Sequence, residues 1–233
     1  MNKFFSHLKT VRTHRKWVRH YCFRAGLYWQ GLTHDLSKYS LAELIESVKY
    51  YSGTRSPIDA AKEDKGYSNA WLHHRGRNKH HREYWTDYYD KGTGVYAMPY
   101  KYAVEMLCDY LGAGKAYNGD SFTFKDEYEW WKKQLDNNIM IHPHTAYFVT
   151  SVLRKCAATE HFNVNLLRTY YDDATAFCAK QGFKNCFGVV LIALRICFGT
   201  NMLENCKNCK YGPVPNPLCE ACDDCLEDEE END

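Results

Sequence analysis

The chain has 233 residues, a formal net charge of +1, 11 histidines, 19 tyrosines and 11 cysteines. This length fits one domain, or one domain with a small appendage, and allows a sizeable core. The near-neutral charge gives no nucleic-acid footprint, although the N-terminal stretch is basic and the tail "EDEEEND" is acidic. We expect a cytoplasmic protein without a membrane segment, because the longest apolar run, "CFGVVLIALRICF", is too short for a bilayer and unpaired thiols suit a reducing compartment.

The sequence predicts an all-α helical bundle that begins with a helical hairpin. Residues at steps of three or four positions form one face of the first predicted helix: Phe4, His7, Val11, His14, Val18, Tyr21 and Ala25. Gly26 can end this helix, and a second helix is expected through "LYWQGLTHDL". Ser40 and Glu43 fit a capping box that opens a third helix, "LAELIESVKYY". The following stretch, "SGTRSPIDAAKEDKG", reads as a long charged loop.

Further helices complete the predicted body. Ser68 can cap a helix that bends or breaks near Gly76, and Pro99 suits the first turn of the next. The remaining helices are predicted in "KDEYEWWKKQL", "HPHTAYFVTSVLRKC", "NVNLLRTYYDDATAFCAKQ" and "CFGVVLIALRICF", with no strand before the tail. We therefore expect a metal-binding helical domain over residues 1–159, further helices packed on it over 160–203, and a Cys-rich tail over 204–233 that ends in an acidic disordered segment.

The stretch "GLTHDLSKYS" places a His-Asp pair at the end of an apolar helix. If the first two helices form an antiparallel hairpin, His14 and His34 both lie roughly 15 Å from the turn, at about 1.5 Å per residue. His14 is thus the best partner for His34 and Asp35 in a metal site, and His7 is the second choice because it shares the same face. The alternative for a single histidine on an apolar face is a satisfied core residue.

The segment "HHRGRNKHH" adds four histidines. His73 and His80, like His74 and His81, are seven residues apart, so an unbroken helix would place each pair on one face. The two members of each pair would then lie too far apart to bind the same ion. They could bind two ions, or one could bind an ion while the other orients a ligand. The alternative is a solvated basic patch that binds an anion.

Two acidic residues, Glu105 and Asp109, lie four residues apart in an otherwise apolar helix. A carboxylate that points inward from such a helix needs a cation. The alternative is two exposed acids beside Lys101 and Lys115. Imidazole and carboxylate ligands together suit a divalent transition metal such as Mn, Fe, Co or Ni.

In chain order, the candidate ligands are a His, the "HD" pair, paired histidines and a later Asp. This pattern resembles the HD-domain superfamily of metal-dependent phosphohydrolases, and the resemblance implies an HD-like helical bundle. These are all-helical proteins in which such residues bind one or two ions. The resemblance implies the following metal ligands: His14, His34, Asp35, His74, His80, His81 and Asp109. It also implies that Lys38, in "HDLSK", faces the substrate phosphate.

A closer resemblance extends over residues 7–145, to a family of uncharacterised bacterial and phage proteins. Its shared blocks are "GLTHDLSKYS", "GYSNAWLHHRGRNKHHREYW" and "PYKYAVEMLCDYLGAGKAY". Members sometimes carry the label catalase, but these residues include no feature of a haem site.

The resemblance implies hydrolysis of a nucleotide or another small phosphate ester. We expect catalytic roles for Asp35, Lys38 and Arg77, and substrate binding by Lys38, Arg75, Arg82 and Tyr84. Trp71 and Trp85 could line the organic group, or pack in the core. Two alternatives stay open: a non-catalytic module that binds a nucleotide or a protein, and a di-iron oxygenase on the same ligands.

The tail "CKNCKYGPVPNPLCEACDDC" contains two CxxC pairs, which predict a structural zinc site. The expected ligands are Cys206, Cys209, Cys219 and Cys222, with Cys225 as a spare or an alternative fourth ligand. Such a tail could dock a protein partner. The alternative is a disordered tail with reactive thiols.

Overall fold

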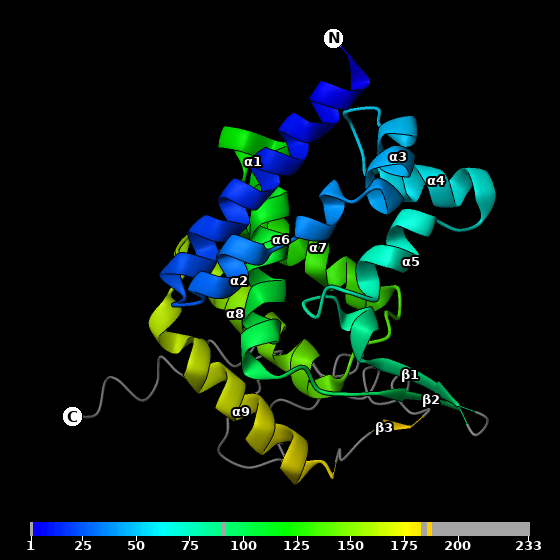
Figure 1. Ribbon diagram of the computed structural model, residues 1–233. Coiled ribbons are helices and arrows are strands. Elements are labelled where there is room, and N and C mark those ends of the chain that lie inside the picture. The colour runs from blue at the N-terminus through cyan, green and yellow to red at the C-terminus, as the bar shows by residue number, and fades with distance from the viewer. Residues whose placement is uncertain (1, 90–91, 183–185, 188–233) are drawn as a thin grey trace.

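The computed structural model describes residues 2–89, 92–182 and 186–187, and this part is mostly helical, as predicted (Figure 1). The first helix, α1 (Lys3–Arg24), starts where the Asn2 side chain accepts a hydrogen bond from the backbone N–H of Phe4. It ends just before Gly26, whose φ of 74° lies in the left-handed region. Its buried face contains five of the predicted residues, His7, Val11, His14, Val18 and Tyr21, together with Cys22, whereas the predicted Phe4 is exposed.

The second predicted helix is shorter than expected and ends at the His-Asp pair. Helix α2 spans Tyr28–Thr33, a short 3-10 helix, η1, spans Leu36–Tyr39, and α3 spans Leu41–Tyr50. The predicted capping box is wrong. Ser40 precedes α3 but makes no side-chain cap, and the Glu43 carboxylate faces two histidines instead of the backbone. Buried imidazoles attract that carboxylate more strongly than a backbone N–H does.

The predicted charged loop contains a helix, α4 (Pro57–Lys65), so that prediction is wrong. The sequence of this segment contains the usual signals of a helix: a proline in the first turn, an acid near the start and lysines near the end. Gly66, which follows the last residue, adopts φ 78°. The Ser68 cap is confirmed, since its hydroxyl accepts from the backbone N–H of Trp71 at the start of α5 (Asn69–Arg75). Gly76 ends α5, which confirms the predicted break.

A small antiparallel sheet, which the sequence did not predict, follows the 3-10 helix η2 (Arg82–Trp85). Its strands are β1 (Thr86–Tyr89), β2 (Gly92–Val95) and β3 (Cys186–Phe187), in that order. The first two residues of the predicted last helix are thus in a strand that pairs with β2. The rest of that helix, and the predicted zinc site from Cys206 to Cys222, lie outside the described residues.

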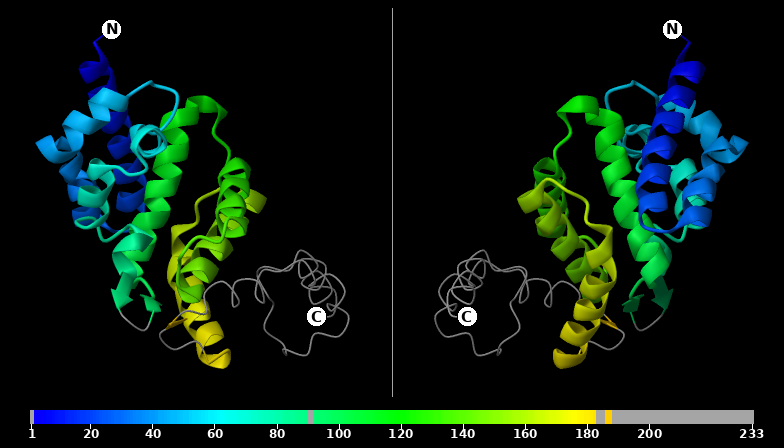
Figure 2. Two further views of the ribbon diagram at one scale, coloured as in Figure 1. Left: turned by 90° about the vertical axis from the view of Figure 1, so that its right-hand side faces the viewer. Right: turned by 90° about the vertical axis from the view of Figure 1, so that its left-hand side faces the viewer.

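The remaining helices are α6 (Tyr100–Asn118), α7 (Phe124–Asp136), α8 (Pro143–Thr159) and α9 (Leu167–Lys180), with short 3-10 turns η3 (Gly119–Ser121) and η4 (Val164–Leu166). Helix α6 is central: α1 to α5 lie on one side of it and α7 to α9 on the other (Figure 2). The apolar core is built from α1 and α6 to α9, around Leu107, Trp131, Phe148 and Leu153. Within the described residues, no helix has the length and apolar character to cross a bilayer.

Helices α1 and α6 approach closely at Gly112. A Cβ atom there would lie 2.5 Å from Cγ2 and 2.9 Å from the backbone nitrogen of Val18. We expect Gly112→Ala to lower the free energy of unfolding by about 1–3 kcal/mol, because the two helices must move apart. Urea unfolding measures this change.

The double variant Val18→Ala/Gly112→Ala is the control for this mechanism. It removes the clash with the side chain but not with the backbone, so stability should recover only in part after the cost of Val18→Ala itself is subtracted. A Gly112→Ala protein as stable as the parent would contradict the close approach.

Glu127 on α7 gives a pH-dependent prediction. It is 8% exposed, and burial together with the charge of Asp109 raises its pKa from 4.5 to about 8. The folded chain therefore keeps this proton between pH 4.5 and about 8, whereas the unfolded chain loses it. The stability from this group is full below about pH 4.5 and is lost as the pH rises to about 8.

Glu127→Gln should remove that loss. We expect the variant to match the parent near pH 5 but to be more stable by about 1–3 kcal/mol at pH 8, measured by urea unfolding. Glu129→Gln, on the more exposed side of the same helix, is the control. Parallel stability curves for the parent and Glu127→Gln would contradict the raised pKa.

Candidate metal centre

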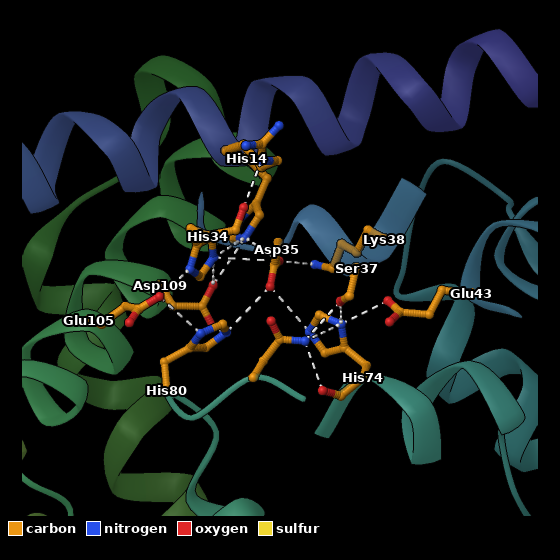
Figure 3. Close-up of polar contacts among 12 residues, drawn as sticks. His14, His34, Asp35, Ser37, Lys38, Glu43, His74, His80, Glu105 and Asp109 are labelled. Atoms are coloured by element: carbon orange, nitrogen blue, oxygen red, sulfur yellow. Dashed lines mark hydrogen bonds and ion pairs between the residues drawn. The ribbon is translucent and has the colours of Figure 1, made fainter. Parts of the chain in front are cut away.

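Histidine and carboxylate side chains from four segments converge in one buried cluster beside α6 (Figure 3). Helix α1, the turn after α2, the region from α5 to η2, and α6 each contribute. The structure brings together all seven side chains that the sequence assigned to metal: His14, His34, Asp35, His74, His80, His81 and Asp109.

The turn that carries His34 and Asp35 has an unusual backbone. Asp35 adopts φ 55°, a left-handed conformation that Asp tolerates better than most residues. The neighbour of His14, Arg15, holds this turn against α1: its guanidinium donates to the His34 carbonyl at 2.7 Å and to the Leu32 carbonyl at 2.9 Å. These bonds satisfy carbonyls at the end of α2 and fix the direction of the pair.

The first ligand set comprises His14, His34, Asp35 and Asp109. The His14 Nε2 atom lies 3.0 Å from Asp109 Oδ1 and 3.4 Å from Asp35 Oδ2. The His34 Nε2 atom lies 3.3 Å from the same Asp109 oxygen and 3.4 Å from the same Asp35 oxygen. The two Nε2 atoms are 3.4 Å apart, so His14 and His34 lie opposite each other, as predicted.

The second ligand set comprises Asp35, His74, His80 and His81. Here the other oxygen of Asp35, Oδ1, lies 3.2 Å from His74 Nε2 and 3.4 Å from His80 Nε2. The chain reverses after Gly76, so His74 and His80 come closer together than an unbroken helix would allow. The two oxygens of Asp35 therefore face different ligand sets.

These separations fit ions at the two positions. Two ligands bound about 2.1 Å from one ion are about 3.0–3.4 Å apart in octahedral or tetrahedral geometry. The Nε2 atoms of His74, His80 and His81 and Oδ1 of Asp35 are buried and make no hydrogen bond among the described residues. Unpaired buried polar atoms are costly, and a shared cation would satisfy all of them.

The charges of the cluster favour cations. Burial would raise the pKa of Asp35, but His34, Lys38 and His74 hold it well below its usual value. Burial would lower the pKa of His80, but the neighbouring carboxylates of Asp35 and Glu105 raise it to about 10. Burial and the charges of His80 and His74 lower the pKa of His81, which leaves its ring neutral and able to bind a metal.

Two further glutamates orient the rings of three ligands. Glu105 Oε1 lies 3.2 Å from Nδ1 of His34 and 3.1 Å from Nδ1 of His80, so it can accept a hydrogen bond from both. Glu43 Oε2 lies 2.8 Å from Nδ1 of His74. A proton on Nδ1 leaves Nε2 free for an ion, and a carboxylate at this place makes the ring more basic.

The turn after α5 is fixed by Asn78. Its amide donates to Ser37 Oγ and to the His74 carbonyl, each at 2.8 Å. It thus holds the reversal that delivers His80 and His81, and it joins this turn to η1.

Some predicted residues lie elsewhere. His7 is not part of either ligand set, and the His73 ring pairs with Glu43. Arg82, assigned to substrate, instead binds the Met140 carbonyl and pairs with Glu83, and Tyr84 stands beside Trp85 with the Lys79 ammonium over its ring. Arg75 and Arg77 make no ion pair with the cluster in the described part of the chain. Of the predicted cations, Lys38 reaches it.

The sequence did not reveal three residues that shape the site: Arg15, Glu43 and Asn78. The position of Arg15 next to His14 is a usable signal. Glu43 was assigned to a cap, and no local pattern shows that it faces a histidine thirty residues later in the chain. The alternative of two exposed acids at Glu105 and Asp109 is wrong, because both are buried.

Comparison with known proteins gives one family. The chain belongs to DUF5662, a family of unknown function. The match extends over residues 3–155 and includes every residue of the cluster. Neither the curated proteins nor the solved structures contain a match to the chain.

The two ligand sets predict different metal contents for different variants. His14→Gln should lose one ion per chain and His74→Gln the other, while Asp35→Asn should lose both, because only Asp35 belongs to both sets. Asn is the right substitution, since it keeps the size and tolerates the left-handed backbone. Elemental analysis of manganese-loaded protein, with circular dichroism as a check on helix content, measures this.

Asp59→Asn, a substitution of an aspartate on α4 outside both sets, is the control and should keep the parent's metal content. Unchanged metal content in Asp35→Asn would rule out the centre.

Proposed function

We propose that the protein is a metal-dependent phosphohydrolase that acts on a small phosphate ester. The observation that supports this most is the position of Asp35, with one oxygen facing each of two ligand sets and the Lys38 ammonium 2.6 Å from Oδ2. Two nearby cation positions and a lysine suit a doubly charged phosphoryl group better than a neutral substrate.

The ligand residues divide the work in this proposal. His14, His34 and Asp109 would hold one divalent ion, and His74, His80 and His81 the other, with Asp35 shared. The ions would supply Lewis-acid activation of water and of the phosphoryl group. Glu105 and Glu43 would keep the histidine rings aligned, so that little reorganisation is needed when charge develops.

Lys38 has the properties of a phosphate-binding group. It sits one 3-10 turn after Asp35 in η1, and its side chain is 28% exposed. Burial would lower its pKa, but Asp35 and Asp109 raise it, so the amine stays protonated at neutral pH. A protonated amine does not bind a metal, so its charge is available to the substrate.

The test uses manganese-, cobalt- or nickel-loaded protein and a panel of nucleotides and phosphomonoesters. At least one member should release phosphate, and Lys38→Ala should slow that release by about ten- to a thousandfold while the metal content stays the same. Lys49→Ala, at an exposed position of α3, is the matched control.

A Lys38→Ala protein as fast as the parent would remove the role of Lys38. A fully loaded parent that is inert on the whole panel would contradict the hydrolase and favour a binding module. Two bound irons with an optical absorption band would favour an oxygenase.

A further inference from the structure

The cluster is exposed at one edge. Asp35 and the side chains of His34, His74 and His80 are at most 2% exposed, whereas the side chains of His14 and Asp109 reach 11% and 12% and that of Lys38 reaches 28%. A molecule from solvent therefore meets the cluster between α1, η1 and α6.

Side chains with no role in either ligand set border this edge. His7 lies two turns before His14 on the same face of α1, and Tyr117 lies two turns after Asp109 on α6. Tyr51, at the end of α3, contacts the His7 ring edge-on at 5.4 Å and shares a 2.8 Å hydrogen bond with Thr10 of α1. We call His7, Lys38, Tyr51 and Tyr117 the rim.

Contacts connect the rim to the cluster: the Lys38 ammonium lies 2.6 Å from Asp35 Oδ2, and the His7 ring contacts the Tyr51 ring. Burial and the charge of Lys38 both lower the pKa of His7. Burial raises the pKa of Tyr117, and the charge of Lys38 opposes that shift. Lys38 is therefore the rim residue that contacts the cluster directly.

His7 is the member of the rim whose chemistry is incomplete. It is 6% exposed, and its Nδ1 atom is buried without a hydrogen-bond partner among the described residues. A buried ring nitrogen in that state costs free energy unless a partner satisfies it. No described residue pairs with this nitrogen, and His7 is too far along α1 from His14 to join the first ligand set, so a bound ligand is a candidate partner.

We propose that the rim binds the organic group of the substrate, and that this group is a hydroxylated ring, as in a sugar phosphate or a nucleoside phosphate. This inference rests on the proposed function. Lys38 would meet the phosphoryl group, His7 Nδ1 would pair with a hydroxyl of the ring, and the faces of Tyr51 and the half-exposed Tyr117 would pack against it.

The experiment measures binding by calorimetry to the manganese-loaded full chain. The probes are ribose 5-phosphate, adenosine 5′-monophosphate and methyl phosphate, which lacks a ring. His7→Leu should weaken binding of a ring-bearing probe by about five- to tenfold, the effect of one lost hydrogen bond, and should change methyl phosphate by less than about twofold.

Matched controls are His20→Leu, an exposed histidine of the same helix, and Tyr67→Ala, an exposed tyrosine outside the rim. If His7→Leu fails to fold, as judged by circular dichroism, the Tyr117→Ala variant decides: it should weaken the ring-bearing probes by a similar factor through lost stacking. Preference for ribose 5-phosphate or for adenosine 5′-monophosphate in the parent identifies the kind of ring.

The outcomes separate the two proposals. Ring-bearing probes that bind in a His7-dependent way without phosphate release support the rim and contradict hydrolysis. Phosphate release from methyl phosphate and ring-bearing esters at equal rates in the parent and in His7→Leu supports hydrolysis and overturns the rim. An equal loss of affinity for all probes in His7→Leu, or no binding of any probe by the parent, also overturns the rim.

Discussion

The site depends on one buried carboxylate, Asp35. It is 1% exposed and meets imidazole nitrogens on both of its oxygens, so its negative charge must be balanced from two directions at once. The backbone that presents it is left-handed, a conformation that costs free energy and persists only where surrounding contacts enforce it. Arg15 of α1 makes those contacts, and the Lys38 ammonium places a further positive charge beside Oδ2 of Asp35. An apolar side chain would pack at this position at a lower cost in free energy, so a functional role is the best explanation for the buried aspartate.

The close contact of α1 with α6 sets the dimensions of the cluster. Gly112 allows the helices to approach until His14 of one helix and Asp109 of the other lie 3.0 Å apart. A larger residue at Gly112 would push the helices apart by a few tenths of an ångström or more, which is a large fraction of the tolerance of a metal–ligand bond. Packing and the geometry of the site are therefore coupled at this interface, although Gly112 belongs to neither candidate ligand set.

The sequence predicted the parts of this arrangement that depend on short-range periodicity. The buried face of α1, and the level of His14 with His34 across a hairpin, follow from 3.6 residues per turn. Periodicity also showed that Glu105 and Asp109 lie on one apolar helix, but it left their burial open. The roles of Glu43 and Asn78 could not be predicted, because they depend on how the chain reverses after Gly76 and on which distant ring each side chain then meets. The assignment of Arg82 and Tyr84 to substrate stays a prediction. The 3-10 helix in that segment, which the sequence did not predict, places Arg82 at the Met140 carbonyl and Tyr84 beside Trp85.

The candidate ligands come from α6 and from segments on one side of it, whereas the apolar core extends through α1 and α6 to α9. The helices on one side, α1 to α5, supply histidines and carboxylates, whereas α8 on the other side buries most of its length and contributes no ligand among the described residues. The family match ends at residue 155, within α8, so it contains the complete cluster and most of the helix that supports α6 from behind. Helix α9 lies beyond that match and packs against α8 and α6. The residues that the family model matches therefore include all seven candidate ligand side chains and the helices α1, α5 and α6 that position them.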